Sequence, residues 1–257
     1  MSYLDSLFSM KDKVAVVTGA ARGNGKSISI ALARAGASVI LIDVLQKELK
    51  STTEEVNSFG CNAVFYICDL SDDKQIKHTL ESIAENYDRV DVLVNNAGVT
   101  YGHHAIDYPE EFWNKTYQVN LRAPYILSIG ISKLMKKFGG SIINITSLGA
   151  ELSFPDNIAY VAFKGGLKQF TKALAHDLSE FNIRANNVGP GYIKTNMTEG
   201  SWNDPELNQS RKDRTLLGRW GMSSDLEGVI IFLASNASSY ITAQDIYVDG
   251  GWTAKGL

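Results

Sequence analysis

Residues 14–36 read VAVVTGAARGNGKSISIALARAG, and this stretch decides the fold. Its first four residues are apolar and mostly β-branched, which predicts a buried parallel strand. Glycines at positions 19, 23 and 25 permit a sharp turn, and the apolar residues after them recur at helical spacing until Gly36. A strand, a glycine-rich turn and a helix in this order present free N–H groups that can bind a pyrophosphate. The stretch therefore predicts the first unit of a dinucleotide-binding α/β fold.

The next apolar run, residues 38–42, predicts a second strand, and it ends in Asp43. A carboxylate at this strand end can accept hydrogen bonds from the ribose hydroxyls of NAD, and it would repel the 2′-phosphate of NADP. Arg22 is the opposing feature, because a guanidinium in the glycine turn could pair with that phosphate. We give Asp43 more weight and predict NAD rather than NADP.

The remainder of the chain repeats the alternation of strands and helices. Strands are expected at 62–67, 90–94, 141–146, 184–188 and from 245, and helices at 45–59, 71–86, 123–135, 157–181 and 224–235. Such alternation predicts a doubly wound parallel sheet of about seven strands with helices on both faces, and a ligand crevice at the carboxyl ends of the strands. Residues 1–257 are expected to form a single domain.

Residues 147–164, SLGAELSFPDNIAYVAFK, carry the candidate chemistry. Tyr160 and Lys164 are four residues apart, so on a helix they lie on one face. A nearby ammonium favours the phenolate, which would make Tyr160 usable as a general acid or base although a free phenol has a pKa of about 10. Ser147 follows a predicted strand, and its hydroxyl could donate to the same substrate oxygen.

Residues 192–219 are polar and poorly periodic. A long irregular segment in a compact domain usually has a function, so we interpret it as a substrate lid.

Composition narrows the classes of partner. With 25 basic and 28 acidic residues the net charge is −3, which gives no electrostatic case for binding nucleic acid or an anionic membrane. Two cysteines without a disulfide framework fit a reducing, cytoplasmic compartment. The paired His103 and His104 lack a spaced third ligand, so no metal site is expected.

Six ordered features together resemble the short-chain dehydrogenase/reductase family: TGAARGNG at 18–25, NNAG at 95–98, Asn120, Ser147, YVAFK at 160–164 and GPGYIKT at 189–195. The resemblance covers about residues 10–253. It implies a Rossmann-type sheet, a nicotinamide cofactor, and hydride transfer to or from a carbonyl or alcohol carbon.

The resemblance also implies residue roles. Tyr160 would be the general acid/base, Lys164 would hold the nicotinamide ribose and lower the Tyr160 pKa, Ser147 would polarise the carbonyl, and Asn120 would order a water that relays the proton. The cofactor would be bound by Gly19, Arg22, Asn24, Gly25, Asp43, Asp69, Leu70, Asn96, Ala97, Gly98, Tyr160, Lys164, Pro190, Gly191, Ile193 and Thr195. Two positions depart from the family pattern. Asn24 replaces an aliphatic residue beside the phosphate site, and Phe163 replaces a small one and is expected to reshape the site wall.

LGRWG at 217–221 and YVDGGW at 247–252 resemble the gluconate 5-dehydrogenase and 2-deoxygluconate 3-dehydrogenase branch. This resemblance favours a sugar acid, polyol or ketose as substrate, with contacts from Ser147, Glu151, Asn157, Tyr160, Tyr192 and Asn196. The alternatives are a 3-oxoacyl reductase, a hydroxysteroid or hydroxy-acid dehydrogenase, or a non-catalytic dinucleotide-binding regulator.

Assembly is the last expectation. The helices at 123–135 and 157–181 carry apolar residues on more than one side, among them Phe163 and Leu167. Related family members pair such helices across a two-fold axis, and the resemblance therefore implies a homotetramer.

Overall fold

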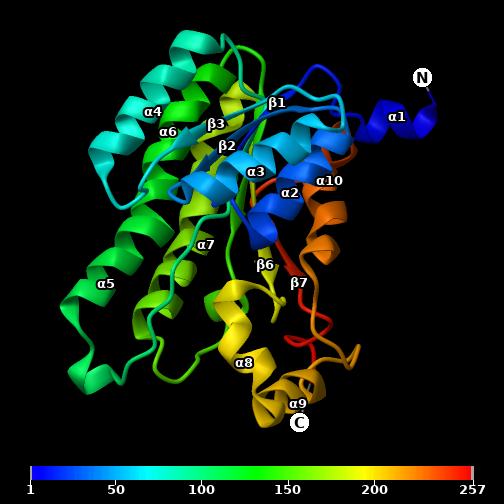
Figure 1. Cartoon of the computed structure of the whole chain (residues 1–257). Coiled ribbons are helices and arrows are strands. Elements are labelled where there is room, and N and C mark those ends of the chain that lie inside the picture. The colour runs from blue at the N-terminus through cyan, green and yellow to red at the C-terminus, as the bar shows by residue number, and fades with distance from the viewer. Residues whose placement is uncertain (1, 256–257) are drawn as a thin grey trace.

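A computed structural model describes residues 2–255 (Figure 1). Seven parallel strands form one sheet in the order β3-β2-β1-β4-β5-β6-β7. The strands are β1 (Val14–Thr18), β2 (Ser38–Asp43), β3 (Ala63–Ile67), β4 (Val92–Asn95), β5 (Gly140–Ile145), β6 (Ile183–Pro190) and β7 (Asp245–Val248). The predicted doubly wound sheet is confirmed. Because β1 lies between β2 and β4, the winding direction reverses there, and a ligand crevice is expected at the carboxyl ends of these strands.

Helices cover both faces of the sheet (Figure 1). On one face pack α2 (Gly23–Arg34), α3 (Gln46–Asn57) and α10 (Glu227–Ala234), and on the other pack α4 (Asp73–Asn86), α6 (Ala123–Met135) and α7 (Ile158–Leu178). Neighbouring residues of a strand enter opposite cores, as Val16 and Val17 do, because successive side chains point to opposite faces. This burial on both sides explains why the strands read as continuous apolar runs.

The remaining helices are α1 (Tyr3–Phe8), α5 (Glu110–Tyr117), α8 (Glu199–Asn203) and α9 (Pro205–Asp213). A π-helical turn over Gln118–Arg122 joins α5 to α6. The helix predicted for 157–181 ends at Leu178 and continues as a 3-10 turn to Phe181. No helix within residues 2–255 is both long enough and apolar enough to cross a membrane.

The predicted lid segment, residues 192–219, leaves β6 and contains α8 and α9. Figure 1 shows these two short helices at one end of the molecule, near the end of the chain. Neither helix contributes a buried residue, which sets this segment apart from the helices on the sheet faces.

Candidate active site

The glycine turn is packed too tightly to accept side chains at Gly19 and Gly25. Gly19 adopts φ +64°, and a Cβ atom added at Gly25 would lie 2.0 Å from the Gly19 carbonyl oxygen. Helix α2 begins at Gly23, and the first N–H groups of a helix have no partner within it. The residues present therefore fit the pyrophosphate of a dinucleotide, which would be bound by these N–H groups and the helix dipole.

Asp43 stands at the end of β2 beside this turn. Its Oδ2 accepts a hydrogen bond from the Ala21 N–H at 3.0 Å, and its Oδ1 accepts one from the Leu45 N–H at 3.0 Å. Arg22, the last residue before α2, is exposed and its side chain makes no capping bond. Through these two bonds the Asp43 carboxylate holds the glycine turn against the end of β2.

Asp69 and Leu70, predicted to lie near the adenine ring, follow β3. Asp69 accepts hydrogen bonds from Ser71 and forms an ion pair with Lys115 at 3.3 Å, whereas Leu70 is buried. Their contact with adenine stays a prediction.

Hydrogen bonds hold the segment after β4 against the glycine turn. The side-chain nitrogen of Asn96 donates to the carbonyl oxygens of Thr18 and Gly19, at 2.9 and 3.2 Å. The Thr18 hydroxyl accepts from the backbone N–H groups of Asn96 and Ala97. These bonds place Asn96 and Ala97 beside the end of the first strand. The contact of Asn96, Ala97 and Gly98 with the cofactor stays a prediction.

Asn120 lies in the π-helical turn and is fully buried. Its Oδ1 accepts from the Val99 N–H and its Nδ2 donates to the Val99 carbonyl oxygen, both at 2.8 Å. The side chain therefore fixes the chain leaving β4. Its role in ordering a water stays a prediction.

Ser147, Tyr160 and Lys164 line one cavity of about 310 Å³ at the carboxyl edge of the sheet. Ser147 follows β5, and its hydroxyl accepts from the Gly149 N–H at 3.1 Å. The buried Lys164 ammonium donates to the Ile145 carbonyl oxygen at 2.6 Å and lies 5.8 Å from the centre of the Tyr160 ring. Strand β5 and helix α7 thus bring a hydroxyl, a phenol and an ammonium to one site.

Burial governs the acid–base properties of this group. It lowers the pKa of Lys164 to about 8. Burial also raises the pKa of Tyr160 above its ordinary value, and the neighbouring Ser147 hydroxyl opposes this rise. Lys164 is not among the causes of this shift, and the expected lowering of the Tyr160 pKa by Lys164 stays a prediction. Tyr160 is a protonated phenol at neutral pH.

The cavity includes many of the predicted residues. Its predicted lining residues are Asn24, Asn96, Gly98, Ser147, Asn157, Tyr160, Lys164, Pro190, Gly191, Tyr192, Ile193 and Thr195. Sequence reasoning missed Thr100, Phe154, Thr198 and Ser201, which also line it. The Thr100 hydroxyl donates to Asn157 Oδ1 at 2.7 Å. Its position two residues after NNAG is a signal that could have pointed to it.

Three residues that the sequence analysis placed at the site do not line this cavity. Glu151 does not line the cavity, because its carboxylate accepts from the Tyr247 hydroxyl and forms an ion pair with Lys168. Asn196 is exposed and also lies outside the lining. Phe163 does not form the wall of this cavity. Its ring packs against Trp113 and Tyr117, with centroids 4.8 and 5.4 Å away, and so joins α7 to α5.

Asn24, the other departure from the family pattern, has a partner. Its Oδ1 accepts from the Ser223 hydroxyl at 2.8 Å. An aliphatic side chain could not make this bond, which ties the first turn of α2 to the chain that follows the predicted lid segment.

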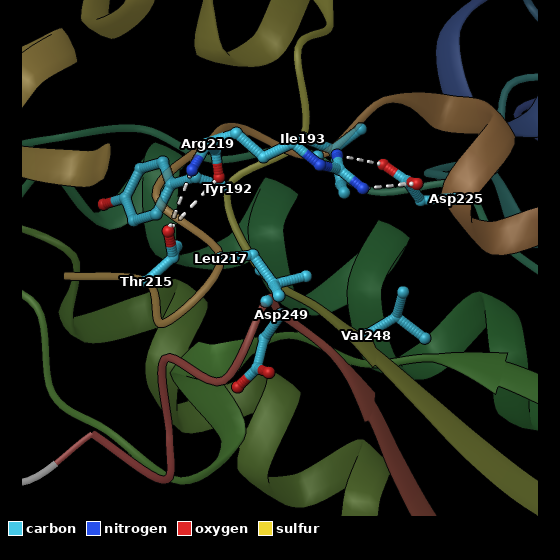
Figure 2. A pocket seen from close by; sticks show the side chains of 11 residues that line it. Tyr192, Ile193, Thr215, Leu217, Arg219, Asp225, Val248 and Asp249 are labelled. Atoms are coloured by element: carbon cyan, nitrogen blue, oxygen red, sulfur yellow. Dashed lines mark hydrogen bonds and ion pairs between the residues drawn. The ribbon is translucent and has the colours of Figure 1, made fainter. Parts of the chain in front are cut away.

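Arg219 fixes the carboxyl-terminal end of the predicted lid segment, residues 192–219. Its guanidinium donates twice to the Asp225 carboxylate, at 2.8 and 2.9 Å, and its N–H donates to the Thr215 hydroxyl (Figure 2). These residues line a cavity of about 170 Å³, whose wall also includes Tyr192. The Tyr192 ring packs against Trp220 and Trp252, with centroids 5.4 and 5.1 Å away. Tyr192 therefore lines both this cavity and the active-site cavity.

Comparison with known proteins agrees with this geometry. The family model described as "Enoyl-(Acyl carrier protein) reductase" matches residues 19–253. The chain is 36% identical to a 2-dehydro-3-deoxy-D-gluconate 5-dehydrogenase of Escherichia coli K12, over 97% of this chain and 99% of that protein. It is 37% identical to a 3-oxoacyl-[acyl-carrier-protein] reductase of Thermotoga maritima, over 94% and 98% of the two chains. A crystal structure of a gluconate 5-dehydrogenase from Burkholderia cenocepacia J2315, in complex with NADP and tartrate, matches with TM-score 0.95 and 29% identity, over 99% of this chain and all of that one.

The fold and the site define an NAD(P)-dependent oxidoreductase that acts on CH–OH groups. The chain belongs to the short-chain dehydrogenase/reductase family.

Proposed function

We propose that this protein oxidises a secondary hydroxyl of a sugar acid, or reduces the corresponding keto group, with NAD as cofactor. The observation that carries the proposal is that Ser147, Tyr160 and Lys164 share a cavity whose walls also offer hydroxyl and amide groups, among them those of Thr100 and Asn157. Such groups suit a substrate with many hydroxyls. The sugar-acid activities named for the relatives from Escherichia coli and Burkholderia cenocepacia support the same substrate class.

The nicotinamide, when bound, supplies or accepts the hydride. The protein's own residues handle the proton. The Tyr160 phenol gives a proton to the substrate oxygen during reduction and takes it back during oxidation, while the Ser147 hydroxyl donates to the same oxygen. Lys164, fixed by the Ile145 carbonyl oxygen, supplies positive charge near the phenol.

A substrate panel tests this function. Absorbance at 340 nm should report turnover of sugar acids at a higher kcat/KM than that of neutral polyols or a 3-oxoacyl thioester. A higher kcat/KM for the thioester would instead support a 3-oxoacyl reductase, the activity of the Thermotoga maritima relative. No turnover of any of them would favour a dinucleotide-binding regulator.

The preference for NAD rests on Asp43. Placing a phosphate dianion near that carboxylate should cost about 2–4 kcal/mol at an effective dielectric constant near 20, and Arg22 would offset part of this. The relative from Burkholderia cenocepacia contains NADP, so the comparison of cofactors is a direct test. Asp43→Asn, which removes the charge but keeps an acceptor for the glycine turn, should narrow the ratio of kcat/KM for NAD over NADP. Arg22→Gln should widen it. Equal kcat/KM for both cofactors in the unmodified protein would contradict the preference.

Residues 192–219 are proposed as a lid over the substrate. Met197, Thr198 and Ser201 line the active-site cavity, while α8 and α9 bury no residue of their own. Hydrogen exchange of backbone amides in this segment should slow when cofactor and substrate are added together. Unchanged exchange would contradict the lid.

A homotetramer is proposed for the assembly. On α6, Tyr125 and Ile129 are 47% and 38% exposed, and Tyr125 packs beside Phe170 of α7. Of the apolar residues on α7, Phe163 and Leu167 are buried within the subunit and are not part of this outer face. Light scattering should give four times the 28.2 kDa chain mass, and a mass near one chain would rule the tetramer out.

The two free thiols, Cys61 and Cys68, support the proposed cytoplasmic location.

A further inference from the structure

A second cavity, of about 510 Å³, adjoins the active-site cavity. The two cavities share three lining residues, Phe154, Asn157 and Tyr192. The other residues around the second cavity are Leu152, Ser153, Pro155, Arg211, Arg214 and Trp252. The Tyr192 ring is thus a wall common to both cavities, and the second cavity lies next to the site of the proposed chemistry.

Arg211 and Arg214, at the end of α9, are held by aromatic rings rather than by acids. The Arg211 guanidinium carbon lies 4.6 Å from the centre of the Tyr192 ring, and that of Arg214 lies 5.9 Å from the centre of the Trp252 ring. Neither arginine forms an ion pair with any residue in 2–255. Arg211 Nε is also buried without a hydrogen-bond partner among those residues. A partly buried guanidinium without an acceptor is unfavourable unless a ligand supplies a negative charge or a hydrogen-bond acceptor.

The wall of the second cavity is positive. Its described lining includes two arginines and no carboxylate. Of the acids near this part of the chain, Glu151 is engaged by Lys168 and Tyr247, and Asp156 is exposed and outside the lining. A guanidinium presents a planar fork of donors that matches a carboxylate, and stacking on an aromatic ring keeps that fork oriented.

We propose that Arg211, assisted by Arg214, binds the carboxylate of the substrate. This inference rests on the proposed function. The reacting carbon of a polyhydroxy acid lies at Tyr160 in the first cavity, and its carboxylate lies in the second, with the Tyr192 ring as the common wall. The two arginines then determine the preference of the enzyme for an acid over a neutral polyol of the same length.

The test compares the best sugar acid of the panel with the neutral polyol of the same carbon chain. In Arg211→Gln, the ratio of kcat/KM for the acid to that for the polyol should fall about 10- to 100-fold, because a charge-assisted hydrogen bond is lost. The change should lie in KM for the acid, and Arg211→Lys should restore part of it. Lys212→Gln is the matched control, since it removes a positive charge from the same helix outside the cavity. It should leave the ratio unchanged.

Arg214 is exposed, so Arg214→Gln gives a variant with little risk to folding, and it should lower the ratio in the same direction by a smaller factor. An unchanged ratio in both variants, or equal losses for acid and polyol, would overturn the carboxylate site. If the unmodified enzyme turned over no sugar acid at all, the proposed function itself would fail, which is a different result from an active enzyme whose acid preference survives Arg211→Gln.

Discussion

The catalytic edge of the sheet and the segment at 192–219 are built by different means. Lys164 and Asn120 are buried, and both are fixed by hydrogen bonds to backbone atoms of the chain leaving β4 and β5. Helices α8 and α9 bury no residue, and Arg211 is held by an aromatic ring. The groups proposed for chemistry are thus part of the core, whereas the groups proposed for substrate choice lie on a surface segment. Substitutions in the first region should change kcat, and those in the second should change KM.

The largest expected effect is that of Tyr160→Phe. Removing the proton-transferring oxygen should lower kcat at least about a hundredfold while the cofactor Kd stays nearly unchanged. Steady-state rates and cofactor titration measure the two quantities. Near-normal turnover would exclude Tyr160 as the acid/base and would erase the contrast between the two regions.

Lys164→Met should have the next largest effect. This substitution keeps most of the volume of the buried side chain, so the fold should be preserved. Because the ammonium is lost, kcat should fall about tenfold or more. Cofactor affinity should weaken as well, since Lys164 is expected to hold the nicotinamide ribose. A loss of rate alone, with an unchanged cofactor Kd, would show that the ribose contact is absent.

The pH dependence of kcat/KM tests the roles assigned to Lys164 and Tyr160. The Lys164 pKa is about 8, so its charge is present below that pH and is lost above it. Burial raises the pKa of Tyr160, so the phenol keeps its proton through the same range. The kcat/KM for reduction should therefore fall by up to about tenfold per pH unit above about pH 8. Lys164→Met should flatten this fall, and an equally steep profile in that variant would assign it to another group.

A pair of glycine substitutions should give the smallest effects. A Cβ at Gly25 would clash with the Gly19 carbonyl oxygen at 2.0 Å, whereas one at Gly200 would meet nothing within 4 Å. Both residues lie in helices, in α2 and α8. Gly25→Ala should lower the free energy of unfolding by about 1–3 kcal/mol and weaken cofactor binding. Gly200→Ala should leave stability unchanged or raise it by up to about 1 kcal/mol. Thermal unfolding with and without cofactor measures both, and similar shifts would show that the two regions are equally constrained.

The sequence predicts the sheet well because its strands are buried on both faces. The runs at Val14–Val17 and Ser38–Ile42 leave no other stable arrangement once helices cover both sides. The site elements on strand ends and on the long helix follow from the order of the strands. Ser147, Tyr160 and Lys164 could therefore be placed together before the structure was known.

Contacts between loops could not be predicted in the same way. Glu151 was expected to contact the substrate, but its partner Tyr247 is 96 residues away, and no local pattern announces that bond. The bond between Thr100 and Asn157 spans 57 residues and depends on the paths of two irregular segments. Arg211 and Arg214 read as ordinary surface charges of a polar helix until the structure sets them over the rings of Tyr192 and Trp252.

The aromatic packing around Tyr192 has an optical consequence. Of the four tryptophans in the chain, Trp220 and Trp252 lie against Tyr192, and Trp202 belongs to α8. Trp113 of α5 packs elsewhere, against Phe163. A change in the packing or hydration of this segment would therefore alter most of the intrinsic fluorescence of the protein. Tryptophan fluorescence can therefore be used, without an attached dye, to follow ligand binding and conformational change at residues 192–219.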